Sequence, residues 1–275
     1  MIAITLPRLA ISEQLFEGME GTNPYVLPLV FSLFAGLSTG LGGVLVLCFR
    51  SHIVDLGVIA CMLGIAASAM ITVSMMDLFF EIAEQIGFAQ TIACCVAGIA
   101  TVAVIRRFGP SVLHEPKADE SADSRLQRVG LITALTLTAH NLPEGMAVAL
   151  STLGSSALGL KMALAIALHN IPEGLAIAGP LLMSRKATPM TAIGITLLSG
   201  LSEPVGALLT LVFFRNVLTQ ELIDYALAFV GGVMIAVAIL ELVPEAVRTG
   251  KHLHTCAGFV IGSTVMAASL QILGD

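Results

Sequence analysis

Long, uniformly apolar runs recur along almost the whole chain, and they restrict its fold more than any other feature of the sequence. A helix needs about 20 apolar residues to cross the ~30 Å hydrocarbon core of a bilayer. Eight runs of about this length cover residues 25–49, 54–80, 87–107, 129–151, 156–183, 188–214, 222–243 and 254–272. They are too long and too uniform for a membrane β-barrel, whose strands alternate over about ten residues. Because helices are the other structure that can span a bilayer, we expect an all-α membrane protein with eight transmembrane helices.

The composition agrees with this expectation. Of the 275 residues, 56% are hydrophobic and only 12% are charged, against about 25% charged in a typical soluble domain. The mean hydropathy is +0.94. The one long polar stretch, residues 108–128, contains two prolines and mixed charges and is expected to be a cytoplasmic loop. We therefore expect one transmembrane domain over residues 1–275, with the lipid bilayer and no nucleic acid as its partner.

Basic residues are divided unequally between the two faces of such a bundle. Ten of the thirteen Lys and Arg residues follow the first, third, fifth and seventh runs, and three lie on the opposite face. Loops on the cytoplasmic side are enriched in basic residues. Both termini are therefore expected outside the cytoplasm, in a plasma membrane, which is the inner membrane if the chain is bacterial.

A six-residue motif occurs twice, inside the fourth and fifth runs. It reads His140-Asn141-Leu142-Pro143-Glu144-Gly145 in the first copy and His169-Asn170-Ile171-Pro172-Glu173-Gly174 in the second. Residues four apart lie on the same face of a helix, so each copy directs a histidine and a glutamate toward one point. Two copies on neighbouring helices would form a metal site inside the membrane.

A second, weaker repeat relates the two ends of the chain. One shift of 164 positions places Gly36 on Gly200, Ser38 on Ser202, Gly42 on Gly206, Met70 on Met234, Asp77 on Glu241 and Glu81 on Glu245. Acidic residues are scarce in these runs, so the two acidic pairs are stronger support than matches between apolar residues. The copies begin five spans apart and therefore cross the membrane in opposite directions, as in many transporters. We expect a 3+2+3 arrangement in which helices 1–3 and 6–8 form an inverted repeat around the doubled motif.

Three glutamates are expected near the middle of the membrane: Glu144, Glu173 and Glu203. Each ionised group there costs roughly 2.5–3.5 kcal/mol on insertion scales, and a divalent cation would offset this cost. A lone buried glutamate could equally be protonated or bonded to backbone, but the grouping with two histidines favours metal. Imidazole with carboxylate suits zinc and iron(II). The amide oxygens of Asn141 and Asn170 would add a second subsite, with the two ions about 3.5–4 Å apart.

The doubled motif, followed by Ser202-Glu203-Pro204-Val205-Gly206 in the sixth run, resembles the ZIP (Zrt/Irt-like) family of divalent-metal transporters. The short loop and the chain length are similar to its bacterial zinc-uptake branch, which has a broad metal range. The resemblance implies uptake into the cytoplasm through a binuclear centre. One implied subsite consists of His140, Glu144, His169, Glu173 and the soft ligand Met70; the other consists of Asn141, Glu144, Asn170, Glu173 and Glu203. The resemblance further implies that helices 1, 4, 5 and 6 slide as a carrier against the other four.

Five further residues are expected along the transport path. The resemblance places Asp77, two turns after Met70, on this path. Glu241 and Glu245, about one turn apart near the cytoplasmic end of the seventh run, are predicted to form an exit relay, with a solvated helix end as the equal alternative. His252 and His254 lie between the last two runs and could contact metal in passing.

The function predicted from these features is transport of Zn²⁺ as a substrate, together with Fe²⁺, Mn²⁺ and Cd²⁺, and not catalysis. Two alternatives are a membrane-embedded zinc metallohydrolase and a metal-sensing receptor without flux. The hydrolase is disfavoured because the chain lacks a His-Glu-x-x-His motif and because a hydrolase has no use for an inverted repeat.

Small residues leave the oligomeric state open. Gly231, Gly232 and Gly258 permit close contact between helices, either within the chain or across a homodimer. The five cysteines contain no Cys-x-x-Cys pair and are interpreted as small core residues.

Overall fold

The computed structural model describes residues 25–48, 55–108, 121–184, 186–213 and 219–274. All regular structure in these ranges is helical, which confirms the all-α fold. The elements are α2 (Val26–Cys48), α4 (Leu56–Met75), η1 (Met76–Glu81), α5 (Ile82–Ile86), α6 (Phe88–Phe108), α7 (Ala122–Gly154), α8 (Ser156–Met183), α9 (Pro189–Gly200), α10 (Ser202–Phe213), α11 (Gln220–Val237), η3 (Ala238–Leu242), α12 (Val243–Arg248) and α13 (His252–Gly274). Most of the predicted loop and five of the basic residues used for orientation (Arg8, Arg50, Lys117, Arg185 and Arg215) lie outside the described residues.

Seven spans among the described helices are long and apolar enough to cross a membrane. Three of them combine shorter elements: α4 with η1 and α5, α9 with α10, and α11 with η3 and α12. The eighth expected span, α7, is 33 residues long. It is not among these seven.

Helix α7 begins earlier than the sequence suggested. Residues 122–128 were expected in a loop, yet they form its first two turns. The Ser121 hydroxyl caps this end by accepting a hydrogen bond from the Ser124 backbone N–H at 3.3 Å, and Asp123 lies in the first turn, where a negative charge interacts favourably with the helix dipole. The polar residues here therefore extend a helix beyond its apolar part.

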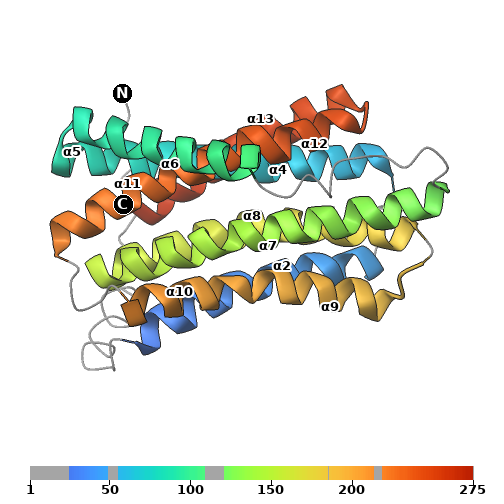
Figure 1. Cartoon of the computed structure of the whole chain (residues 1–275), viewed down its shortest axis with the longest axis horizontal. Coiled ribbons are helices and arrows are strands. Elements are labelled where there is room, and N and C mark those ends of the chain that lie inside the picture. Colours follow the sequence, from blue (N-terminus) through green and yellow to red (C-terminus); the bar gives the residue numbers. More distant parts are fainter. Residues whose placement is uncertain (1–24, 49–54, 109–120, 185, 214–218, 275) are drawn as a thin grey trace.

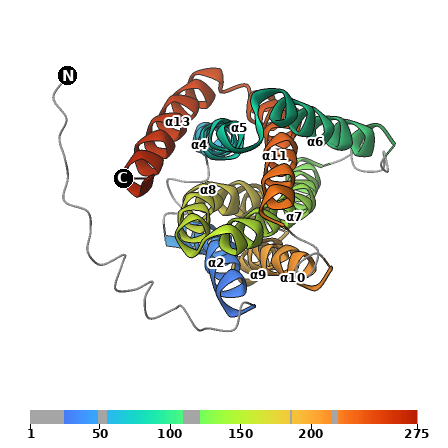
Figure 2. The same cartoon turned by 90° about the vertical axis from the view of Figure 1, so that its left-hand side faces the viewer.

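The helices form two layers (Figure 1). One layer contains α2, α7, α8, α9 and α10, and the other contains the α4, α6, α11 and α13 spans. The end-on view places α7 and α8 between the outer helices of the two layers (Figure 2). There α8 packs against α4, and α7 packs against α11. The first layer has the membership that the resemblance implied for the carrier, whereas its sliding stays a prediction.

The 164-residue repeat is visible in the helix contacts. A Cβ added to Gly36 would lie 2.2 Å from the Gly200 carbonyl oxygen, and one added to Gly200 would lie 2.0 Å from that of Gly36. These two positions are repeat equivalents, so α2 and α9 meet as two related surfaces meet across a two-fold axis. The same relation holds further along, because Gly42 lies against the Ile171 carbonyl and Gly206 against the Leu142 carbonyl.

The span that begins with α4 and the span that begins with α11 each contain a π-helical segment, at related positions. The shift of 164 carries residues 74–78 onto η3, so the two segments overlap at the residues 76–78 of η1. Segments of π-helix are rare and are often found at functional sites. Here they hold Asp77 and Glu81 in one repeat and Glu241 in the other.

Three glycines that the sequence allowed to pack either within the chain or across a homodimer make contacts within this chain. A Cβ at Gly232 would lie 2.1 Å from the Cys95 carbonyl oxygen, one at Gly258 2.1 Å from that of Cys61, and one at Gly231 2.8 Å from Leu78 Cβ. They therefore serve intramolecular helix packing, and a homodimer stays a prediction without their support. Cys61, Cys94, Cys95 and Cys256 are free thiols, and Cys256 is exposed on α13 instead of lying in the core.

Candidate metal site

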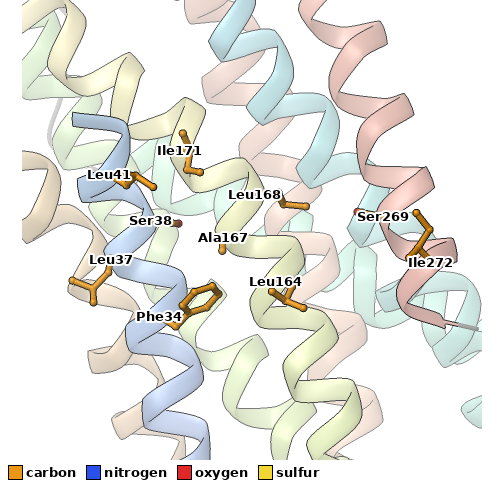
Figure 3. A pocket seen from close by; sticks show the side chains of 10 residues that line it. All are labelled: Phe34, Leu37, Ser38, Leu41, Leu164, Ala167, Leu168, Ile171, Ser269 and Ile272. Carbon is orange, nitrogen blue, oxygen red and sulfur yellow. The ribbon is translucent and has the colours of Figure 1, made fainter. Parts of the chain in front are cut away.

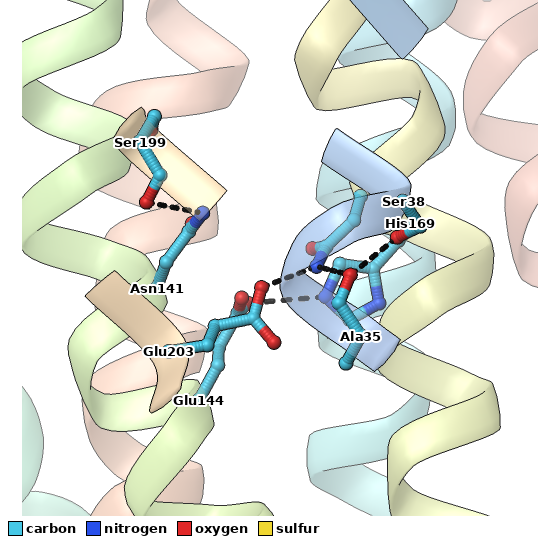
Figure 4. A network of polar contacts seen from close by, with 8 residues as sticks. Ala35, Ser38, Asn141, Glu144, His169, Ser199 and Glu203 are labelled. Carbon is cyan, nitrogen blue, oxygen red and sulfur yellow. Dashed lines mark hydrogen bonds and ion pairs between the residues drawn. The ribbon is translucent and has the colours of Figure 1, made fainter. Parts of the chain in front are cut away.

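The two motif copies face each other at the α7–α8 contact in the centre of the bundle. His169, Glu144 and Glu173 are fully buried, and His140 is 3% exposed. His169 Nε2 lies 3.0 Å from Glu144 Oε1 (Figure 4). Ligand atoms of Glu144, His169 and Glu173 lie within 4.8 Å of one another. An imidazole and two carboxylates at this separation could bind one divalent cation.

The two asparagines are held in equivalent ways. Asn170 Nδ2 donates to the Ala35 carbonyl at 3.0 Å, and Asn141 Nδ2 donates to the Ser199 carbonyl at 3.3 Å. Positions 35 and 199 are related by the shift of 164. These bonds use the nitrogen side of each amide, and both buried Oδ1 atoms have no partner among the described residues. The amide oxygens are therefore available to a cation.

Serines support the same two carbonyls. Ser38 Oγ donates to the Ala35 carbonyl at 2.6 Å, and Ser202 Oγ donates to the Ser199 carbonyl at 2.6 Å. The two serines are also repeat equivalents. One serine and one asparagine thus share each carbonyl, which fixes the orientation of both amides relative to α2 and α9.

Glu203 brings a third carboxylate to the centre from α10. It is fully buried, and its Oε1 accepts a hydrogen bond from Asn170 Nδ2 at 2.5 Å. A Cβ added to Gly145 would lie only 1.8 Å from the Glu203 carbonyl oxygen. The motif glycine is therefore needed for the close approach of α10 to α7. The helix is interrupted at Leu201, between α9 and α10, two residues before Glu203.

The two halves differ in chemistry at the position of Glu203. The repeat equivalent of Glu203 is Thr39, a fully buried residue whose hydroxyl has no hydrogen-bond partner among the described residues. The backbone carbonyl at both positions packs against a motif glycine. A Cβ at Gly174 would lie 1.9 Å from the Thr39 carbonyl oxygen, as one at Gly145 would lie close to that of Glu203. The repeat is a sequence signal that could have identified Thr39, because a hydroxyl residue occupies in one half the position that a glutamate occupies in the other.

Polar atoms without partners are concentrated at this centre. Among the described residues these atoms include His140 Nε2, Asn141 Oδ1, Glu144 Oε2, His169 Nδ1, Asn170 Oδ1, both Glu173 carboxylate oxygens and Glu203 Oε2. In folded proteins about 90% or more of buried polar groups are hydrogen-bonded. A cluster of exceptions in one place indicates a site shaped for an ion or its waters.

Not every predicted ligand lies in the compact group. His140 and Glu203 are outside the set of Glu144, His169 and Glu173, although both are buried with an atom that lacks a partner. Met70 is fully buried on α4 within the hydrophobic core, and α4 packs against α8. Its role as a ligand stays a prediction.

The residues predicted along the path lie away from the compact group. Asp77 is buried and forms an ion pair with Lys161 of α8, with 3.0 Å between Oδ1 and Nζ. Glu241 forms an ion pair with Arg106 at 3.5 Å, and Glu245 forms one with Arg248 at 3.0 Å. The sequence motifs gave no signal for these partners, because the basic residues indicated only the orientation in the membrane.

The two histidines near the last helix are also separate from the motif. His252 and His254 are exposed in the first turn of α13. His254 lies near the start of α4, where its Cδ2 would be 2.8 Å from a Cβ added to Gly57. The structure does not bring either histidine to the doubled motif.

A separate cavity of about 560 Å³ lies between α2, α8 and α13 (Figure 3). Its lining is apolar except for Ser38 and Ser269, whose hydroxyls donate to the Ala35 and Met266 carbonyls. Because it offers no charged or imidazole ligand, it suits hydrocarbon and not a metal ion.

Comparison with known proteins supports the family resemblance. The model of the family described as ZIP zinc transporter matches residues 109–270. Zinc transporter ZupT of Chlorobium luteolum is 39% identical over 265 residues, which cover 89% of this chain and 97% of that relative. Zinc transporter ZupT of Corynebacterium glutamicum is 36% identical, covering 88% of this chain and 97% of that relative. This is a family of transporters and not of enzymes, so the metallohydrolase alternative is set aside. The chain belongs to the ZIP family of integral membrane metal transporters.

Proposed function

We propose that this protein carries Zn²⁺ across the membrane to the cytoplasm through the centre formed by α7, α8 and α10. The observation that carries the proposal is the group of buried polar atoms without protein partners around the His169–Glu144 contact. The relatives named as zinc transporters support zinc as the substrate.

We infer two subsites that share Glu144 and Glu173. His140 and His169 would complete the first, with Met70 as a soft ligand, while Asn141, Asn170 and Glu203 would complete the second. The contacts of the asparagines favour this division, because both amides present their oxygens toward the centre once their nitrogens bond to Ala35 and Ser199. Shared carboxylates bind each ion less tightly than separate ones would, and a transported ion must also leave.

The packing of the motif helices against helices of both layers favours transport over storage. The motif helices α7 and α8 contact the other layer through α11 and α4, and these two contacts are equivalent under the repeat. An inverted repeat provides related inward-open and outward-open arrangements. The excess of basic residues on one face supports an orientation with both termini outside the cytoplasm.

The metal range is proposed from ligand chemistry. Imidazole suits zinc and iron(II), carboxylates suit Mn²⁺, and a methionine thioether favours softer ions such as Cd²⁺. We therefore expect Fe²⁺, Mn²⁺ and Cd²⁺ to compete with Zn²⁺ for uptake.

Uptake of radioactive zinc into proteoliposomes tests the proposal. Glu144→Ala and Glu173→Ala should each abolish uptake, because each removes a carboxylate that both subsites share. Glu221→Ala removes an exposed glutamate at the start of α11 and should leave uptake unchanged. Near-normal uptake by either site variant would overturn the shared-carboxylate centre.

A further inference from the structure

Lys161 of α8 joins the two layers through two ion pairs. Its Nζ lies 3.0 Å from Asp77 Oδ1 and 2.9 Å from Glu81 Oε1, both in η1. The side chains of Lys161 and Asp77 are only 11% and 2% exposed, whereas that of Glu81 is 52% exposed. The ammonium therefore lies between a buried carboxylate and a solvated one, where a cation arriving from water would pass.

The inverted repeat makes this arrangement unusual. Glu241 and Glu245 are the equivalents of Asp77 and Glu81, and their partners Arg106 and Arg248 belong to the same layer as the acids. The two motif copies are 29 residues apart, so Ile132 of α7 occupies the position equivalent to Lys161. Lys161 of α8 thus pairs with the acids at one end of the path. At the other end, next to Glu241 and Glu245 in the repeat, the equivalent position is the apolar Ile132.

The ion pairs lie on the extracellular side of the site in the orientation proposed above. Lys161 precedes His169 by eight residues, which is about 12 Å along an α-helix. Three further buried polar atoms on η1, α4 and α7 have no partner among the described residues: Asp77 Oδ2, Ser74 Oγ and Ser151 Oγ. Asp77 lies about two turns beyond Met70, and Ser151 lies about two turns beyond Glu144. Their spacing along the helices therefore places polar atoms at heights from the ion pairs toward the metal site.

We propose that Lys161 is a tethered competing cation at the extracellular mouth of the path. Its ammonium occupies Asp77 and holds α8 to η1 until an incoming divalent cation displaces it. This role rests on the proposed function, since it requires a metal ion moving inward past Asp77. The lysine weakens metal binding at the mouth, because it competes for the carboxylate and repels the arriving ion.

The experiment is the initial rate of zinc uptake into proteoliposomes as a function of zinc concentration. Lys161→Met should lower the KM for zinc several-fold, because it removes the cation that competes for Asp77. Lys161→Arg keeps the positive charge and should keep the KM near that of the original chain. Asp77→Asn should raise the KM, because it removes the acid that receives the metal. Lys186→Met, which removes an exposed lysine bonded to Ser124, serves as the matched control and should change neither KM nor kcat.

The outcomes separate the two proposals. If the original chain takes up no zinc, the proposed function itself fails. If it takes up zinc and Lys161→Met has an unchanged or higher KM, Lys161 is not a competing cation. If neither Lys161→Met nor Lys161→Gln accumulates in the membrane while Lys161→Arg does, the residue is structural and the inference is overturned. A lower KM in Lys161→Met or Lys161→Gln, with Lys161→Arg unchanged, supports it.

Discussion

At the scale of single residues, the motif assigns different tasks to neighbouring side chains. The histidine and glutamate point into the α7–α8 contact, while the asparagine between them bonds to a carbonyl of α2 or α9. Their spacing along a helix made the His-Glu pairing predictable. The bonds to Ala35 and Ser199 were not predictable, because they depend on how α2 and α9 pack against the motif helices.

Replacement of His169 should change which metal is preferred more than it reduces total uptake. Imidazole favours zinc over manganese, whereas carboxylates favour manganese, so His169→Ala should lower the ratio of Zn²⁺ to Mn²⁺ uptake. A tenfold change corresponds to about 1.4 kcal/mol, and this is the size expected for one lost ligand. Competition between the two ions in proteoliposomes measures the ratio. An unchanged ratio, with Glu221→Ala as the comparison, would exclude His169 as a selecting ligand.

At the scale of helices, the existence of the spans was predictable and their interruptions were not. Length and hydropathy indicate a span through residues 54–80, but no residue pattern in that run predicts the π-helical segment at Met76–Glu81. The sixth span is interrupted at Leu201, between α9 and α10, and Pro204 lacks the N–H that would bond to the Gly200 carbonyl. The start of α7 was placed too late because its first turns are polar, and polarity there marks a helix end outside the membrane.

Close approach of α7 and α10 should depend on Gly145. A Cβ there would lie 1.8 Å from the Glu203 carbonyl oxygen, whereas a Cβ at Gly194 of α9 would meet no atom within 4 Å. Gly145→Ala should therefore destabilise the protein by about 1–3 kcal/mol through overpacking and displace Glu203. Gly194→Ala should be neutral or stabilising by up to about 1 kcal/mol, since alanine favours helix. Thermal unfolding in detergent and zinc uptake measure both effects; equal stability of the two variants would contradict this contact.

At the scale of the whole molecule, the chain forms two layers, and the inverted repeat relates the two halves of each layer. The acidic pairs in register predicted that relation, and the reciprocal contact of Gly36 with Gly200 displays it in space. Which helices share a layer could be expected only through the family resemblance. The composition of a span does not say which neighbour it will pack against when every span is apolar.

Movement of one layer against the other should be blocked by a covalent link between them. Gly179 of α8 faces Ile59 of α4, with 3.2 Å from a Cβ built on the glycine to Ile59 Cδ1. In a background without native cysteines, Gly179→Cys with Ile59→Cys should lose uptake on oxidation and regain it on reduction.

The control links two helices of the same layer. Gly40 of α2 lies against Leu197 of α9, so Gly40→Cys with Leu197→Cys should keep uptake after oxidation. Full transport by the oxidised α4–α8 pair would rule out relative motion of the layers at that contact.

The pairing of Glu203 with Thr39 under the repeat has a consequence for energetics. Two identical halves would make the forms open to either side of the membrane equal in free energy when empty. An acid in one half and a hydroxyl in the other are one of the differences that remove that degeneracy, so we expect the unloaded protein to prefer one side. A bound cation that neutralises Glu203 should reduce this bias, and its release should restore it.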